Sequence, residues 1–113
     1  MKIPEAAVIT SEKLTDYLLT WRPADDKSLF LERAGFVRQQ PEKLAEAIRQ
    51  LAASGDAQED GHSEYGIFYR VEGFMYGPND TNLAVVLIWL RWHLDQTYHF
   101  VTLKPSKGIH REN

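Results

Sequence analysis

The sequence predicts one α+β domain, in which two to three N-terminal helices pack on a three- to four-stranded antiparallel sheet with meander order. Three observations predict it: helical spacing of apolar residues before Gly55, strand-forming residues from Glu64 onward, and turn residues between the apolar runs. A chain of 113 residues can build one hydrophobic core, whereas two separate domains would each be marginal. We therefore expect a single domain over residues 1–105 and a flexible C-terminal tail over residues 106–113.

The first expected helix begins at Ser11, whose side chain can cap the free amides of the first turn. Leu14, Leu18 and Trp21 follow at the spacing of one helical face. Pro23 ends this helix, because proline lacks the amide hydrogen that the helix would use.

Two more helices are expected before the sheet. A short one runs from Asp25 or Asp26 to Gly35, because a glycine followed by an apolar residue is a common helix stop. The next begins at Pro41, which suits the first helical position, and ends before Gly55. Its apolar stripe consists of Leu44, Ile48, Leu51 and Ala52.

The second half of the chain predicts consecutive antiparallel strands. Residues 54–64 show no apolar period and are interpreted as an exposed connector. Turn residues at 77–80 and 95–97 then separate three strand-like runs, and Pro105 closes the last one. The expected strands are residues 64–76, 83–92 and 98–103, with a short additional edge strand at 6–9.

Composition excludes several classes of protein. Thirteen Lys and Arg against sixteen Asp and Glu give a net charge of -3, so no general attraction to nucleic acid or anionic membranes is expected. The absence of cysteine excludes disulfides, thiol nucleophiles and thiolate metal sites. The longest apolar run, Leu83 to Leu90, is far shorter than the roughly 20 residues of a membrane-spanning helix. With no signal-peptide pattern at its start, the chain is expected to be cytoplasmic.

Familiar catalytic and cofactor motifs are missing, so any site must be assembled from separated residues, and we expect neither a cofactor nor a metal. His93 and His99 flank the second turn and could share a metal if Asp95 supplied a third ligand. The alternative is that both histidines are solvent-exposed turn residues.

A polar surface is a second candidate site. Arg70, Arg91, His99 and Thr102 could lie together on the sheet face opposite the helices. Metal-independent RNA cleavage uses such groups, because it needs a general base or acid and a cation that stabilises the phosphorane. The alternative is that these residues only solvate an exposed sheet face.

Aromatic residues of the sheet are expected to be mostly core, since few lysines accompany them as nucleic-acid stacking would require. Tyr76 and Trp92 are candidates for a partner surface, because large aromatic side chains near the end of a sheet favour interfaces. The open edges of so small a sheet could also pair with a second copy of the chain.

Several short segments resemble a bacterial domain-of-unknown-function family of small standalone proteins, which is similar to C-terminal modules of polymorphic toxins. The segments are Lys13–Leu19, Lys27–Leu31, Gly35–Phe36, Tyr65–Tyr69, Ile88–Trp89 and Val101–Leu103. The resemblance implies a small α+β fold with kinship to metal-independent ribonuclease toxins, and it singles out Lys27 and the pair Tyr65 and Gly66. The family's histidine-proline approach to this lysine is replaced here by Trp21–Asp26.

Two functions are therefore expected. The first is a domain that acts through protein contacts, including self-association, because no catalytic motif is present and the strand at 83–90 is apolar on both faces. The alternative is a metal-independent ribonuclease-like or nucleotide-binding domain, with Arg70, Arg91, His99 and Thr102 as its site and Lys27 nearby.

Overall fold

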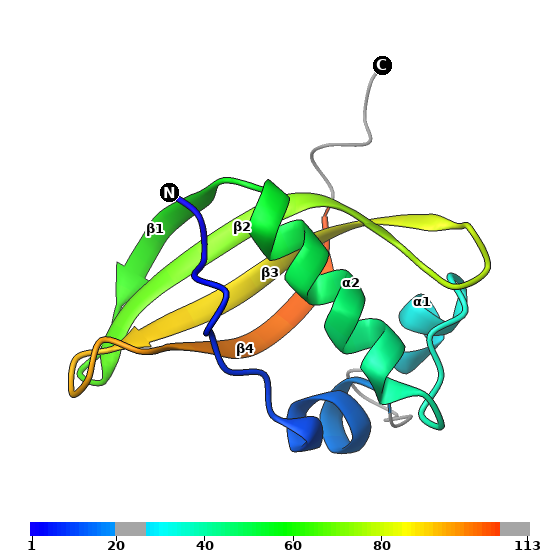
Figure 1. The fold of residues 1–113 in the computed structure, drawn as a ribbon, viewed down its shortest axis with the longest axis horizontal. Coiled ribbons are helices and arrows are strands. Elements are labelled where there is room, and N and C mark those ends of the chain that lie inside the picture. Colours follow the sequence, from blue (N-terminus) through cyan, green and yellow to red (C-terminus); the bar gives the residue numbers. More distant parts are fainter. Residues whose placement is uncertain (20–26, 107–113) are drawn as a thin grey trace.

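The computed structural model describes residues 1–19 and 27–106, in which three helical segments cover one face of a four-stranded antiparallel sheet (Figure 1). The elements are η1 (Lys13–Leu18), α1 (Ser28–Glu32), α2 (Pro41–Ser54), β1 (Ala57–His62), β2 (Gly66–Tyr76), β3 (Asn82–Trp92) and β4 (Tyr98–Pro105). The strands lie side by side in chain order, so the sheet is a meander. The predicted fold class is confirmed.

The first helix, η1, is a π-helix, since the backbone N–H of Leu19 donates to Leu14 O five residues earlier, at 2.9 Å. The predicted cap at Ser11 is wrong. The side-chain oxygen that accepts a first-turn amide is Thr10 Oγ1, which lies 3.4 Å from Lys13 N. Leu14 and Leu18 are buried as predicted.

The other helices follow their local signals. Gly35 has φ +92° and ends the α1 segment, with its N–H donating to Glu32 O and the next N–H, of Phe36, donating to Leu31 O. These paired bonds are the Schellman motif that the glycine predicted. Pro41 is the first residue of α2, also as predicted. Three predictions fall outside the described residues: the helical face position of Trp21, the helix end at Pro23 and the helix start at Asp25 or Asp26.

The expected connector at residues 54–64 is wrong, because most of it forms β1. After Ala57 every side chain of this edge strand is exposed, so its sequence carries no apolar alternation that would have predicted a strand. The pairing of β1 with β2 is also irregular between Glu59 and His62, where Gly61 has φ +92°. The bulge and the polar side chains hide the strand signal.

The hairpin of β2 and β3 forms where it was predicted. Its register runs without interruption from Gly66 opposite Trp92 to Tyr76 opposite Asn82. The turn at residues 77–81 is closed by the N–H of Gly77, which donates to Thr81 O at 3.0 Å. The expected extra strand at residues 6–9 is confirmed as a single parallel bridge, in which Val8 pairs with His99 of β4.

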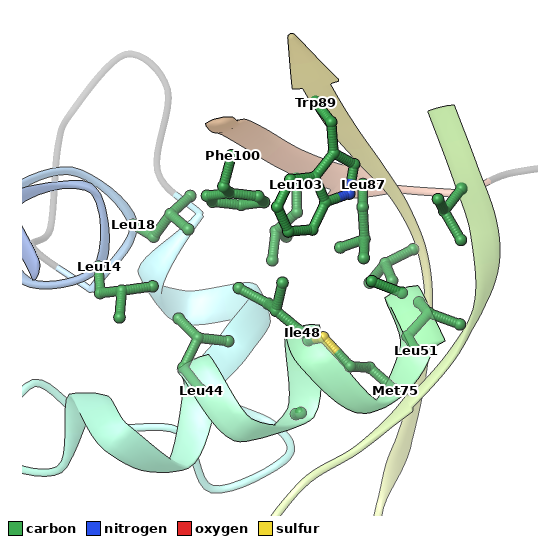
Figure 2. Packing of buried hydrophobic residues seen from close by; sticks show 14 of the residues in the cluster. Leu14, Leu18, Leu44, Ile48, Leu51, Met75, Leu87, Trp89, Phe100 and Leu103 are labelled. Atoms are coloured by element: carbon green, nitrogen blue, oxygen red, sulfur yellow. The ribbon is translucent and has the colours of Figure 1, made fainter. Parts of the chain in front are cut away.

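The hydrophobic core lies between α2 and the sheet (Figure 2). From the helices and the loop after α1 it includes Leu14, Leu18, Leu31, Phe36, Leu44, Ile48 and Leu51, and from the sheet Val71, Met75, Val85, Leu87, Trp89, Phe100 and Leu103. Each fully buried side chain of this size stabilises the fold by about 1.5–3 kcal/mol. All three helical segments lie on this side, so the other face of the sheet has no described element over it.

Candidate functional site

The sheet face opposite the helices, called the outer face, is fixed by the strand register. Side chains on one face alternate along each strand, and Val71, Leu87 and Leu103 point into the core. Their neighbours in sequence therefore form the outer face. It carries Gln58, Phe68, Arg70, Glu72, Phe74, Tyr76, Ala84, Val86, Ile88, Leu90, Trp92, His99, Thr102 and Lys104.

The outer face is apolar along β3 and at both ends of β2. This outer apolar strip runs along β2 and β3 and consists of Phe68, Phe74, Tyr76, Val86, Ile88, Leu90 and Trp92. Tyr76 is 67% exposed at one end, Trp92 is 37% exposed at the other, and Phe74 is also exposed. This face is therefore more apolar than a purely solvated sheet face would be.

Beside Tyr65 and Trp92 the surface is hollowed further. A hollow of about 330 Å³ is lined by Tyr65, Leu90, Trp92 and Leu94. Tyr65 and Leu94 are both exposed. Leu94 was not among the predicted site residues, because it lies in a turn and belongs to no apolar pattern in the sequence.

Polar side chains cross the outer face near the middle of β2, between Phe68 and Phe74. Arg70 Nη1 lies 3.4 Å from Glu72 Oε1, and Ser106 Oγ donates a hydrogen bond to Glu72 Oε2. Thr102 and Lys104 lie on the same face, opposite Ile88 and Val86. Glu72 and Ser106 were not among the predicted site residues, although Glu72 has the strand parity of Arg70.

Arg91 lies on the wrong face for the predicted polar surface. It is paired with Ile67 and Tyr98, and its guanidinium carbon lies 5.9 Å from the centre of the Tyr69 ring on the helix side. Arg70 is opposite Ile88 instead, so the two arginines point to opposite sides of the sheet. Of the four predicted polar residues, Arg70, His99 and Thr102 share the outer face.

His99 is held by the turn that precedes it. Its ring stacks on Trp92 at 3.6 Å between centroids, and its Nε2 lies 2.7 Å from Thr97 Oγ1. Thr97 Oγ1 donates to Asp95 Oδ1 at 2.6 Å, so this hydroxyl oxygen accepts from His99 Nε2–H. Hydrogen bonds from the side chain and then the backbone of Thr97 lower the pKa of Asp95. The arrangement fixes the Trp92 ring at the end of the outer apolar strip.

The predicted metal alternative gains no support from this geometry. Among residues 1–19 and 27–106 there is no group of three or more His, Asp or Glu side chains that could hold a metal ion. His93 is exposed, and its backbone N–H donates to Tyr65 O at 2.9 Å.

Lys27 lies away from Arg70, beside η1. Its Nζ is 3.5 Å from Tyr17 Oη and 5.4 Å from the centre of that ring, and Lys13 Nζ approaches the same ring at 5.9 Å. Tyr17 and Thr102 both line a shallow depression of about 390 Å³. Tyr17 therefore lies beside Lys27, which the resemblance singles out, and shares a depression with Thr102 of the predicted polar surface.

The sheet edges are poorly suited to strand pairing. The β1 edge carries the bulge at Gly61 together with Glu59 and Asp60, which are devices that discourage edge-to-edge association. The β4 edge is covered in part by Val8, whose N–H donates to Tyr98 O and whose carbonyl accepts from Phe100 N, both at 2.8 Å.

Comparison with known families matches residues 2–107 to a domain of unknown function, DUF6883. This chain belongs to the DUF6883 family. The suspected membership in a bacterial domain-of-unknown-function family is thereby confirmed. Comparison with curated proteins finds no significant match.

The fold of this DUF6883 chain also occurs in a solved structure, described as a contact-dependent growth inhibition toxin and immunity protein complex from Klebsiella pneumoniae 342. The TM-score is 0.68 at 22% sequence identity, and the match covers 91% of this chain and 96% of that chain. The likeness at this identity shows a shared fold. Within the described residues, no helix of this chain has the length and apolar character to cross a membrane.

Proposed function

We propose that this DUF6883 domain binds another protein through the outer face of its sheet. The observation that supports the proposal best is the outer apolar strip, which ends in the exposed rings of Tyr76 and Trp92. Trp and Tyr are enriched among the few residues that supply most of the binding energy in protein interfaces. Large exposed apolar side chains gathered on one face often mark an interaction surface.

The dimensions and rigidity of the outer face suit an interface. The paired strands β2 and β3 are 11 residues each, so the strip extends for about 35 Å at the usual rise per strand residue. Trp92 is fixed by its stack on His99, so little side-chain entropy is lost when a partner covers it.

The charges around the strip suggest the chemistry of the partner. Arg70 is paired with Glu72, while Lys104 is exposed and forms no ion pair within the described residues. The surface that fits is therefore an apolar ridge with an acidic group beside it. The solved structure with this fold contains two different proteins, which supports a heterologous partner. Pairing through the sheet edges is disfavoured by the β1 bulge, so self-association through them is the less supported alternative.

The test uses the proteins encoded beside the gene for this domain. Each is co-expressed with the domain, and complex formation is measured by size-exclusion chromatography and by titration calorimetry of the purified pair. The double variant Tyr76→Ser, Trp92→Ser should weaken the complex at least tenfold. Leu29→Ser, at a residue of α1 that is 56% exposed, is the matched control and should bind normally. Equal loss in both variants, or no complex with any neighbour, contradicts the proposal, and a homodimer alone supports self-association instead.

A second candidate function is metal-independent RNA cleavage, favoured by one observation. Arg70, Glu72 and Ser106 are joined across the outer face, with Lys104 on the same face. The Glu72 carboxylate could accept the proton of a ribose 2′-hydroxyl as its oxygen attacks the adjacent phosphorus, while Arg70 and Lys104 stabilise the charge on the phosphorane. A general acid would give a proton to the departing 5′-oxygen. His99 lies four residues from the Glu72 row along β3, about 13 Å away at the usual strand rise, so it is distant from this carboxylate.

A further inference from the structure

A cavity lies on the helix side of the sheet, away from the outer face. It has a volume of about 730 Å³ and lies between the N-terminal segment and α2, open to solvent along most of its rim. Trp89 of β3 is its only lining residue from the sheet among the described residues, and it closes the inner end. The other lining residues are Lys2, Ile3, Pro4, Glu5, Ala45, Glu46, Arg49, Gln50, Ala52 and Ala53.

Trp89 has an unsatisfied hydrogen-bond donor. The side chain is 0% exposed, and its Nε1–H has no acceptor in the part of the chain that the structure describes. The ring meets Phe100 edge-on at 5.4 Å, and Figure 2 shows the indole nitrogen on the side of the ring turned away from Phe100. Buried polar groups in proteins almost always have a partner, so the indole N–H of a residue that lines this cavity calls for an acceptor from a water or a bound molecule.

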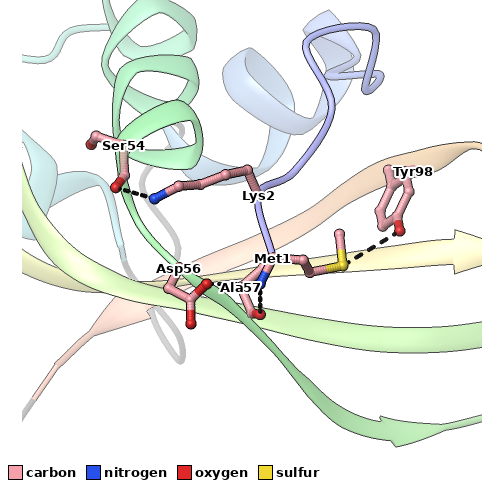
Figure 3. Close-up of polar contacts among 6 residues, drawn as sticks. All are labelled: Met1, Lys2, Ser54, Asp56, Ala57 and Tyr98. Carbon is pink, nitrogen blue, oxygen red and sulfur yellow. Dashed lines mark hydrogen bonds and ion pairs between the residues drawn. The ribbon is translucent and has the colours of Figure 1, made fainter.

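The N-terminal wall of the cavity is held by polar contacts at its borders. Lys2 Nζ donates to Ser54 O at 2.6 Å, and the amino group of Met1 lies 2.7 Å from Asp56 Oδ1 (Figure 3). Arg49 Nη1 donates to Ala7 O at 2.9 Å. The N-terminal segment is therefore held at both ends. These contacts keep it from collapsing onto α2 and filling the cavity.

The charge of the lining favours an uncharged occupant. Lys2 and Arg49 bring two positive charges and Glu5 and Glu46 bring two negative charges, so ions of neither sign are selected. The remaining wall near the sheet is apolar, with Ile3, Pro4 and the α2 alanines. Pockets of this size with an apolar lining and one oriented polar group are typical of small-molecule sites.

We infer that this cavity binds a small, uncharged and mainly apolar molecule that carries one carbonyl acceptor for Trp89 Nε1–H. The apolar part lies against Ile3, Pro4 and Ala53. Because Trp89 is fully covered, the neighbouring side chains move apart as the acceptor reaches the indole. The site is on the opposite side of the sheet from the proposed protein contact, and either can fail without the other.

The experiment follows the indole N–H signals of the three tryptophans by ¹H–¹⁵N NMR, assigned with single Trp→Phe variants. Acetophenone, a neutral aryl ketone, is titrated into the full chain, with ethylbenzene and benzoate as matched probes that lack the acceptor or carry a charge. Acetophenone should move the Trp89 signal downfield in a saturable way, by more than either matched probe. The Trp92 signal should not change.

A cavity-filling variant makes the result specific. Ala53→Leu places a larger side chain in the cavity from an exposed position of α2, so folding should be retained and the acetophenone response lost. Ala6→Leu, which is exposed and does not line the cavity, is the control and should respond normally. An unchanged Trp89 signal at saturating acetophenone, or the same response in Ala53→Leu, overturns the inference.

Discussion

Ser106 hydrogen-bonds Glu72 from the far side of β3, so the end of the described chain is attached to a strand two positions away in the sheet. The backbone N–H of Ser106 also donates to Ala84 O at 2.8 Å. Beside this contact Val86 is only 4% exposed, although it belongs to the outer face. The contacts of the described chain therefore continue through Ser106, and residues 107–113 lie outside the described residues.

Ser106→Ala should destabilise the fold. It removes a hydrogen bond to a carboxylate in a partly buried place, so the free energy of unfolding should fall by about 1–2 kcal/mol. Urea denaturation measures the change. Ser11→Ala is the control, since Ser11 is exposed and does not cap η1, and its midpoint should stay close to that of the wild type. A wild-type midpoint for Ser106→Ala would show that the bridge contributes nothing.

Gly77→Ala should destabilise the fold strongly, although the substitution adds only a methyl group. A Cβ at this position would lie 1.9 Å from Ala34 O and 2.5 Å from Ala34 Cβ, so the β2–β3 turn and the end of the α1 segment would be forced apart. We expect a loss of about 2 kcal/mol or more in the free energy of unfolding. At Gly61 nothing lies within 4 Å of such a Cβ, so Gly61→Ala should cost only the backbone strain of φ +92°, about 1 kcal/mol. The reverse order of the two midpoints contradicts the close packing of this turn.

Acid should loosen the turn before β4. The two Thr97 hydrogen bonds lower the pKa of Asp95 below its usual value, so the folded state prefers the ionised carboxylate. This stabilisation is present above the unfolded pKa of about 3.9 and is lost as pH falls through the lowered folded value. NMR titration should show a shift of the Thr97 amide in the acid range, where Asp95 takes up its proton. In Asp95→Asn that acid step should be absent, and an identical curve in the variant would exclude Asp95 as its source.

RNA cleavage, if the domain has it, should depend on Glu72 more than on His99. Glu72→Gln keeps the size of the side chain but removes the base, so cleavage of a fluorescent RNA in the presence of a chelator should fall at least a hundredfold. His99→Gln should have a smaller effect, because His99 is bonded to Thr97 and stacked on Trp92. Loss of activity in His99→Gln alone would restore the histidine as the general base, and an inert wild type would remove this second function.

The helices and hairpins could be predicted because their signals are local. Gly35 and Pro41 act within one helical turn, and the turn residues at 77–80 join strands that are adjacent in sequence. The strand β1 could not, because an exposed edge strand needs no apolar alternation. Its place in the sheet is set by pairing with β2, and the residues of β1 alone carry no signal for this pairing.

The candidate site could be predicted only in part, for a reason of register. Pairing of Tyr76 with Asn82 sets Arg70 opposite Ile88, and this places Arg91 on the helix side. In a strand, one residue of displacement moves a side chain to the other face. An error of one residue in the predicted turn therefore changes which charged side chains share a face. The Ser106 contact depends on the path of the chain beyond β4, which no pattern in β2 indicates.

The central claim, protein binding through the outer face, is tested most directly by hydroxyl-radical footprinting of the domain alone and in complex with its partner. The method reports the solvent access of individual aromatic and aliphatic side chains. Binding should protect Phe74, Tyr76 and Trp92 from oxidation and leave Leu29 of α1 unchanged. Protection of Leu29 with Tyr76 and Trp92 still reactive would contradict the claim and place the contact on the helix side.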